Sequence, residues 1–181
     1  MKWKNTIDGY GSVPVALHWL TAILIIIAYA TMELHDLAER GTPLRQSMKT
    51  WHYMAGISVF ALTWLRLSVR LAGATPQILP TPPRIQTRLA SIVKITLYCL
   101  MLGLPLLGWL TLNGKGREVE YFGYVLPTLI GKNPALADLF KKVHETLANT
   151  AYFVIGLHTL AALYHHYFRR DSTMRMMWFR R

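Results

Sequence analysis

The sequence predicts an all-α fold, an integral membrane four-helix bundle, and three observations lead to this prediction. Hydrophobic residues make up 52% of the 181 residues, whereas charged residues make up only 16%. Four apolar segments are each long enough, at about 20 residues, to cross the hydrocarbon core of a bilayer. Polar, charged or Pro-rich connections separate these segments, and residues 1–181 are expected to form a single domain.

The four predicted spans follow one another along the chain. They comprise residues 13–34, 52–71, 91–112 and 144–168. Pro105 lies inside the third span, where neighbouring helices can compensate for the backbone hydrogen bond that proline does not make. Lys2 and Lys4 precede the first span as in a signal peptide, but its apolar run is longer than a typical signal core and no small-residue cleavage site is evident. We therefore expect this segment to be retained as a span.

Two of the connections carry distinct sequence signals. Residues 73–84 are Pro-rich, which predicts an extended loop. Residues 113–143 predict a longer loop, and Asn133 and Pro134 near its end predict the cap and first residue of a short helix that leads into the fourth span.

The net charge of +11 arises from 20 Lys and Arg residues against 9 Asp and Glu residues. In a soluble protein this excess would indicate nucleic-acid binding. Here the basic residues lie between and beyond the apolar segments, so membrane lipid and topology account for them and we expect no nucleic-acid partner. More of them flank the spans on the side of the termini, which predicts that both termini are cytoplasmic. The basic residues on that side are Lys2, Lys4, Arg66, Arg70, Arg84, Arg88, Arg169, Arg170, Arg175, Arg180 and Arg181.

Four of the seven histidines fall into two pairs of equal membrane depth. Polar side chains inside a membrane are energetically costly and usually face the interior of a helix bundle with a partner. Since successive spans alternate in direction, His18 and His158 both lie towards the inner side of the membrane. His52 and His144 both lie at the outer starts of their spans. Each pair therefore joins two different helices at one depth.

The chemistry of these pairs predicts haem. His144 and His158 are fourteen residues apart, which places them on nearly the same helix face and about 21 Å apart along the axis. Zinc usually takes three or four protein ligands, whereas a haem iron needs only two axial ligands from the protein. Cys99 is the single cysteine, which excludes a disulfide within the chain and an iron–sulfur cluster. We predict two stacked bis-histidine haems, the inner one bound by His18 and His158 and the outer one by His52 and His144.

Residues near the predicted ligands are expected to make room for the haems. Ala148 and Ala151 lie on the face between His144 and His158, and Gly56 lies one turn after His52, where small side chains leave space for a flat macrocycle. Arg66 lies fourteen residues after His52, which places it near the inner pair as a candidate partner of a haem propionate. The alternative is that Arg66 extends to the membrane surface.

The other histidines and one lysine are less specific. His165 continues the face of His158 and is a candidate quinone ligand, propionate contact or headgroup-level residue. His166 is turned away from that face, and we expect it at the interface. His35 ends the first span, where we expect a structural role. Lys94 is expected to extend its amine to the inner surface, and the alternative is a proton-donating or quinone-contacting role.

Four sequence motifs resemble the bacterial cytochrome b561 family over almost the whole chain. They are "LHW" at 17–19, "WHYMAG" at 51–56, "HETLANTAYFVIGLH" at 144–158 and "AALYHHYFRRDSTMRMM" at 161–177. The resemblance implies a four-helix cytochrome of the bacterial inner membrane with two haem b groups, ligated by the same four histidines. Members exchange electrons with quinone. One close type is a superoxide oxidase that passes electrons from superoxide to ubiquinone, with its quinone site near the positions of His165 and His166. Relatives can carry histidines early in the third span, where this chain has Ser91 and Lys94.

The function expected from these features is electron transfer between a periplasmic donor, with superoxide as a candidate, and ubiquinone. Basic residues on the outer side would steer an anionic donor towards the outer haem. They are Arg40, Arg45, Lys49, Lys115, Arg117, Lys141 and Lys142. Two alternatives remain: a membrane anchor that carries electrons for a separate dehydrogenase or hydrogenase, and a divalent-metal transporter. The near absence of carboxylates within the spans disfavours the transporter.

Overall fold

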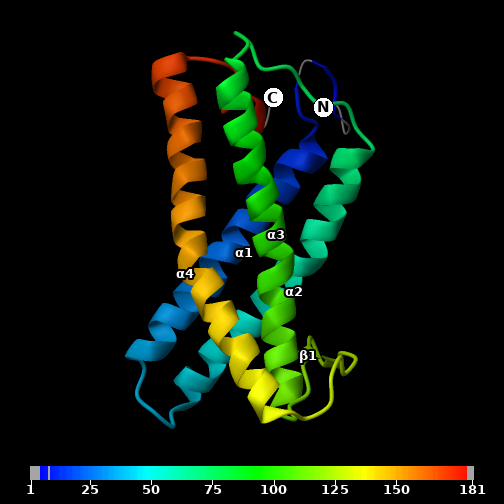
Figure 1. The fold of residues 1–181 in the computed structure, drawn as a ribbon, viewed down its shortest axis with the longest axis vertical. Coiled ribbons are helices and arrows are strands. Elements are labelled where there is room, and N and C mark those ends of the chain that lie inside the picture. Colours follow the sequence, from blue (N-terminus) through cyan, green and yellow to red (C-terminus); the bar gives the residue numbers. More distant parts are fainter. Residues whose placement is uncertain (1–4, 8, 179–181) are drawn as a thin grey trace. The chain divides into compact units, whose positions relative to one another are not determined.

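Four long helices dominate the computed structural model, which describes residues 5–7 and 9–178 (Figure 1). They are α1 (Ser12–Leu37), α2 (Pro43–Leu71), α3 (Arg84–Gly114) and α4 (Pro134–Tyr164). Within the described residues, four helices are long and apolar enough to cross a membrane. The predicted all-α membrane four-helix bundle is thereby confirmed.

Each helix is longer than the span predicted for it, and α4 shows why. The helix begins at Pro134, where the side-chain oxygen of Asn133 accepts a hydrogen bond from the backbone N–H of Leu136 at 3.1 Å. The predicted cap is correct, but the separate short helix is wrong. No proline or glycine interrupts residues 135–143, so the helix continues without a break into the fourth span.

The connection between α3 and α4 contains a small hairpin that the sequence did not predict. Strand β1 (Glu120–Tyr121) pairs antiparallel with β2 (Tyr124–Val125). Phe122 and Gly123 form the turn, both with positive φ angles of 48° and 83°. The buried side chain of Asn113 holds this connection, because it donates to the carbonyl of Arg117 at 3.1 Å and accepts from the N–H of Leu129 at 2.9 Å.

The chain divides into two compact units, and each of the four helices contributes one part to each unit. The termini unit contains residues 1–20, 64–99 and 150–181. The hairpin unit contains residues 21–63 and 100–149. His18 and His158 belong to the termini unit, whereas His52 and His144 belong to the hairpin unit. Each predicted ligand pair therefore lies within one unit.

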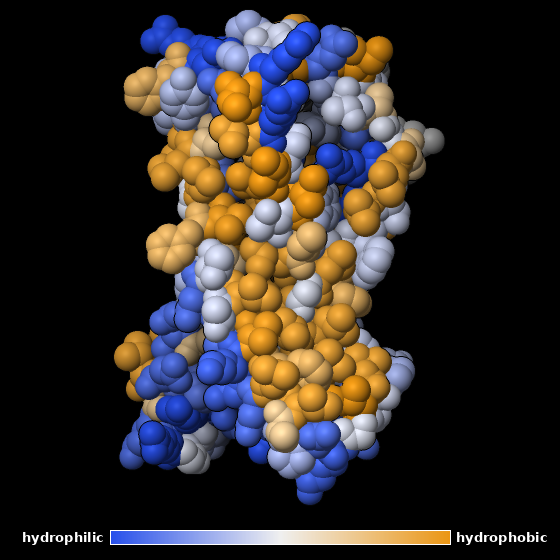
Figure 2. All heavy atoms as spheres, viewed as in Figure 1, coloured by the Kyte–Doolittle hydropathy of each residue, from blue (hydrophilic) through white to orange (hydrophobic). Residues whose placement is uncertain are grey.

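The outward faces of the helices are apolar, and the buried positions include hydroxyl-bearing and small residues beside a few aliphatic ones. Phe153 and Leu160 on α4 are 80% and 64% exposed, as suits side chains that face lipid. Thr63 is fully buried, and its hydroxyl donates to the carbonyl of Val59 one turn earlier at 2.6 Å. Figure 2 shows hydrophobic residues over the helices and hydrophilic residues gathered over the connections. This pattern is typical of membrane helices that pack through small residues.

A structured segment follows α4 in the termini unit. It comprises a π-helix, η1 (His165–Arg169), and a 3₁₀ helix, η2 (Arg175–Met177). The indole N–H of Trp19 on α1 donates to the carbonyl of Met177 at 2.9 Å. Two hydrogen bonds of 2.9 and 3.0 Å join Ser172 to Leu79 in the Pro-rich connection.

Four of the basic residues predicted on the inner side of the membrane lie outside the described residues: Lys2, Lys4, Arg180 and Arg181.

Candidate functional site

The imidazoles of His52 and His144 face each other in the hairpin unit, with ring centroids 6.1 Å apart. Each Nδ1 lies 2.9 Å from a backbone carbonyl, that of Ala28 on α1 for His52 and that of Leu104 on α3 for His144. A carbonyl oxygen only accepts hydrogen bonds, so both Nδ1 atoms must carry the proton. Each ring is thereby left with an unprotonated Nε2, which is the form that ligates a metal.

The imidazoles of His18 and His158 form the corresponding pair in the termini unit, with ring centroids 6.3 Å apart. Nη2 of Arg66 lies 3.1 Å from Nδ1 of His18. The same guanidinium lies over the ring of Tyr98, 5.8 Å from its centroid. Arg66 is therefore held beside a predicted ligand and does not extend to the membrane surface. Arg70 lies over the same ring at 5.6 Å.

The spacing within both pairs fits two imidazoles bound to one metal ion. A metal–imidazole bond is about 2.0 Å and a ring nitrogen lies about 1.1 Å from its centroid, so that two axial rings have centroids about 6.2 Å apart. The observed separations of 6.1 and 6.3 Å agree with this value. The residues present thus fit a bis-histidine centre in each unit.

A haem fits these pairs better than a bare metal ion. Among residues 5–7 and 9–178, no group of three or more His, Cys, Asp and Glu side chains could hold a metal. A haem iron receives four nitrogen ligands from the porphyrin and requires only two from the protein.

Two glycines lie near the pair in the hairpin unit: Gly56, which the sequence predicts there, and Gly108, which it does not. A Cβ added at Gly56 would meet nothing within 4 Å, so there is open space beside α2 one turn after His52. A Cβ added at Gly108 would lie 3.6 Å from Cε1 of His144. Ala151 in the termini unit is only 2% exposed, so protein atoms cover this one position of the face predicted to receive a macrocycle. A small residue at a buried position also suits close helix packing.

Gly108→Leu is expected to disturb the haem of the His52–His144 pair selectively. A Cβ already makes van der Waals contact with the His144 ring, and the further carbons of leucine must displace it. The visible absorption and haem content of the purified variant report the change. Gly131→Leu is the matched control, because Gly131 lies in an exposed connection with nothing within 4 Å of an added Cβ. Unchanged absorption and two haems in Gly108→Leu would contradict the expected contact.

His165, the predicted quinone contact, has a partner that the sequence analysis missed. Its Nδ1 is hydrogen-bonded to Oδ2 of Asp171, whose side chain is fully buried. Oδ1 of Asp171 accepts from the backbone N–H of Thr173 at 3.0 Å. Burial raises the pKa of Asp171, but the hydrogen bonds from His165 and Thr173 outweigh it and hold the pKa below its ordinary value. The Asp-Ser-Thr sequence signals a turn, but it does not reveal the contact with His165.

The remaining predicted residues lie in separate surroundings. His35 is 6% exposed, and its Nδ1 lies 2.8 Å from Oδ1 of Asp36. His166 lines a cavity of about 220 Å³ together with Arg170, Asp171 and Arg175.

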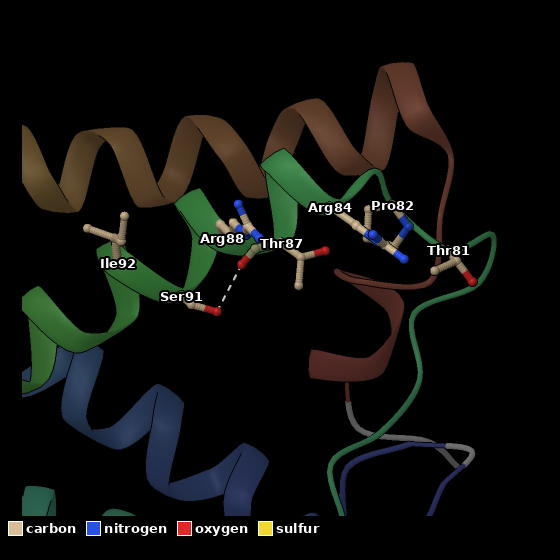
Figure 3. A pocket seen from close by; sticks show the side chains of 7 residues that line it. All are labelled: Thr81, Pro82, Arg84, Thr87, Arg88, Ser91 and Ile92. Atoms are coloured by element: carbon tan, nitrogen blue, oxygen red, sulfur yellow. Dashed lines mark hydrogen bonds between the residues drawn. The ribbon is translucent and has the colours of Figure 1, made fainter.

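A hollow of about 570 Å³ over the start of α3 contains Ser91 but none of the predicted haem ligands (Figure 3). Its lining residues are Thr81, Pro82, Arg84, Thr87, Arg88, Ser91 and Ile92. The hydroxyl of Ser91 donates to the carbonyl of Thr87 at 2.9 Å, and that of Thr87 donates to the carbonyl of Pro83 at 3.3 Å. The exposed arginines of this hollow suit the anionic surface of a membrane.

Known proteins match this chain over nearly its whole length. The family model for prokaryotic cytochrome b561 matches residues 9–180. Cytochrome b561 homolog 1 of Escherichia coli (strain K12) is 37% identical over 171 residues, which cover 94% of this chain and 97% of that protein. The probable superoxide oxidase CybB of Yersinia pestis is 38% identical over 169 residues, which cover 93% of this chain and 95% of that protein. Cytochrome b561 homolog 2 of E. coli (strain K12) is 26% identical over 184 residues, which cover 98% and 95% of the two chains.

Proposed function

We propose that this chain, which belongs to the prokaryotic cytochrome b561 family, carries electrons on two bis-histidine haems from a periplasmic donor to ubiquinone. Family membership confirms the resemblance found in the sequence motifs. It makes the chain a multi-pass bacterial membrane cytochrome that binds b-type haem and transfers electrons. The number of haems, their ligands, the donor, ubiquinone and the cytoplasmic position of both termini are parts of the proposal.

The pairing of the four histidines carries the proposal. His18 lies opposite His158 in one unit and His52 lies opposite His144 in the other, at separations suited to one iron each. Haem iron with two axial imidazoles accepts and releases single electrons and has no open position for oxygen. The hydrogen bonds from His52 and His144 to backbone carbonyls fix the ring orientation and increase the basicity of the ligating nitrogen.

Arg66 would bind a propionate of the haem at the His18–His158 pair. An iron-ligating His18 carries its proton on Nδ1, and this nitrogen then no longer accepts from Arg66. The guanidinium is already placed beside the ligand, 3.1 Å from His18, and has five donors for carboxylate oxygens. A propionate carboxylate is the acceptor that a haem would supply there.

The quinone would bind near His165, at the end of α4 in the termini unit. His165 follows His158 by seven residues, a rise of about 10 Å along a helix. Its Nδ1 is occupied by Asp171, so its Nε2 is the ring nitrogen left for a substrate oxygen.

Superoxide is the donor suggested by the relative from Yersinia pestis, which is named a probable superoxide oxidase. The predicted steering cations all belong to this unit, where Arg45 and Lys141 lie 3.7 and 3.3 Å from Asp36 and Glu145. The unit holds 8 Lys and Arg residues against 7 Asp and Glu residues, so any steering of an anion would come from local groups of cations and not from the net charge of the unit. Two superoxide ions would each give one electron and leave as oxygen, and ubiquinone would take the two electrons and two protons to become ubiquinol.

Raising the ionic strength is expected to slow haem reduction by superoxide severalfold. The Debye length falls from about 30 Å at 0.01 M salt to about 10 Å at 0.1 M, so that steering by surface charges is screened. Stopped-flow absorption of the haems measures the rate. A neutral hydroquinone donor serves as the control and should show little salt dependence. A rate with superoxide that stays flat across this range would contradict steering.

The purified chain alone tests the proposed function. With a superoxide source and ubiquinone-1, it should consume superoxide and form ubiquinol in a ratio of two to one. The alternative, an anchor for a dehydrogenase or hydrogenase, differs in the source of electrons. Haems that superoxide does not reduce, and that a co-purifying second subunit does reduce, would replace our proposal with that alternative.

A further inference from the structure

A buried carboxylate in the termini unit has no role in holding haem. Asp171 is 1% exposed and lies beyond the last turn of α4. Carboxylates are rarely buried without a partner because the loss of hydration is large. Both of its oxygens are used, Oδ2 by Nδ1 of His165 and Oδ1 by the N–H of Thr173.

The backbone around Asp171 is shaped to bring it back to His165. The π-helix η1 ends at Arg169 and is capped by Arg170, whose φ of 53° is in the left-handed region. The backbone N–H groups of Arg170 and Asp171 both point to the carbonyl of His165, the latter at 3.2 Å. His165 is thus bonded to this turn through both its backbone and its ring. Such π-helical turns are frequent at functional sites.

The His35–Asp36 pair in the hairpin unit differs from the His165–Asp171 pair in the exposure of its carboxylate. The Asp36 side chain is 77% exposed, and it belongs to the residue next to His35. The Asp171 side chain is 0% exposed, and Asp171 follows His165 by six positions in the sequence. An exposed carboxylate can exchange its partner for water, whereas the buried one holds a single ring nitrogen. Asp171 therefore keeps a proton on Nδ1 of His165 and directs Nε2 to whatever binds there.

We infer that Asp171 positions His165 as the proton donor to ubiquinone, an inference that rests on the proposed function. The Nε2–H bond of the doubly protonated ring breaks, and an O–H bond forms on a carbonyl oxygen of the quinone as electrons arrive from the haems. The Nδ1–H group of His165 stays hydrogen-bonded to Asp171 throughout. Water then returns a proton to Nε2. Two such transfers, with two electrons, convert quinone to quinol.

The surroundings of the pair allow proton supply from the aqueous side. The cavity of about 220 Å³ beside Asp171 is large enough for several water molecules. Its charged and titratable lining groups are His166, Arg170 and Arg175, and the ring of Tyr164 lies against His165 with centroids 5.9 Å apart. Water in this cavity would reach the pair from the surface of the protein.

The test uses haem-loaded protein reduced with dithionite and then mixed anaerobically with ubiquinone-1. Asp171→Asn should retain both haems, and its haem reoxidation at saturating quinone should be at least 10-fold slower, since a general acid contributes about 10²–10⁴-fold. The quinone concentration for half-maximal rate should change less than threefold. Asp36→Asn is the matched control and should reoxidise at the wild-type rate. Independently of activity, ¹⁵N NMR of histidine-labelled protein should show a hydrogen-bonded Nδ1–H group at His165 in the wild type and the loss of that hydrogen bond in Asp171→Asn.

The outcomes separate this inference from the proposed function. Wild-type haems that ubiquinone-1 does not oxidise would overturn the proposed function and the proton step with it. A wild type that is oxidised, with Asp171→Asn oxidised equally fast, would overturn only the role of Asp171. If Asp171→Asn does not fold with two haems, His165→Gln decides, because glutamine can bond to Asp171 but has no proton to transfer. A wild-type maximal rate in His165→Gln would overturn the inference, and a loss of at least 10-fold would support it.

Discussion

Replacing His144 with alanine is expected to remove one haem and leave the other in place. His144 faces His52 in the hairpin unit, whereas His18 and His158 face each other in the termini unit, and we propose one haem for each pair. The haem content of the purified protein should fall from two to one per chain. His158→Ala should also give one haem per chain, and the two variants should differ in which absorption band remains.

The control for these variants is His166→Ala, which alters a histidine at the end of the same span that belongs to neither pair. It should keep two haems. Helix content from circular dichroism identifies variants that fail to fold. A folded His144→Ala protein with two haems, or with none, would contradict the assignment of separate centres.

Arg66→Gln is expected to lower the reduction potential of one haem and leave the other nearly unchanged. A positive charge beside an axial ligand favours the reduced iron, and Arg66 lies 3.1 Å from the His18 ring. A unit charge about 7 Å from the iron, at an effective dielectric constant of about 20, contributes about 2 kcal/mol, which corresponds to ~100 mV for one electron. A potentiometric titration followed by visible absorption measures both haems.

Arg70→Gln provides a matched control for this prediction. Arg66 and Arg70 both lie over the Tyr98 ring, at 5.8 and 5.6 Å from its centroid, but the contact with His18 is made by Arg66. Arg70→Gln should therefore change the potentials much less. An equal shift of both haems in Arg66→Gln, or an equal effect of the two variants, would contradict the placement of Arg66 at one centre.

The pairing of the histidines could be predicted because helix geometry alone determines it. A helix of fixed rise and turn relates residue number to depth and face, so His144 and His158 had to share a face of α4. Because the four spans alternate in direction, the sequence also predicts which histidine lies opposite each of these two: His52 opposite His144, and His18 opposite His158. Side-chain identity and spacing were sufficient for this step, and both pairs are found together in the structure.

The partners that orient these residues could not be predicted in the same way. The carbonyls of Ala28 and Leu104 accept from His52 and His144. Every residue has such a carbonyl, so no residue type marks them. The contact between Asp171 and His165 depends on a π-helical turn and a left-handed arginine, which are unusual backbone conformations without a distinct sequence signal.

A reduced-minus-oxidised visible spectrum of the purified protein, combined with a haem count, tests the central claim most directly. The four paired histidines predict two low-spin b-type haems per chain, each reducible and reoxidisable. One haem per chain or none, in folded protein supplied with haem and with all four histidines intact, would contradict the account.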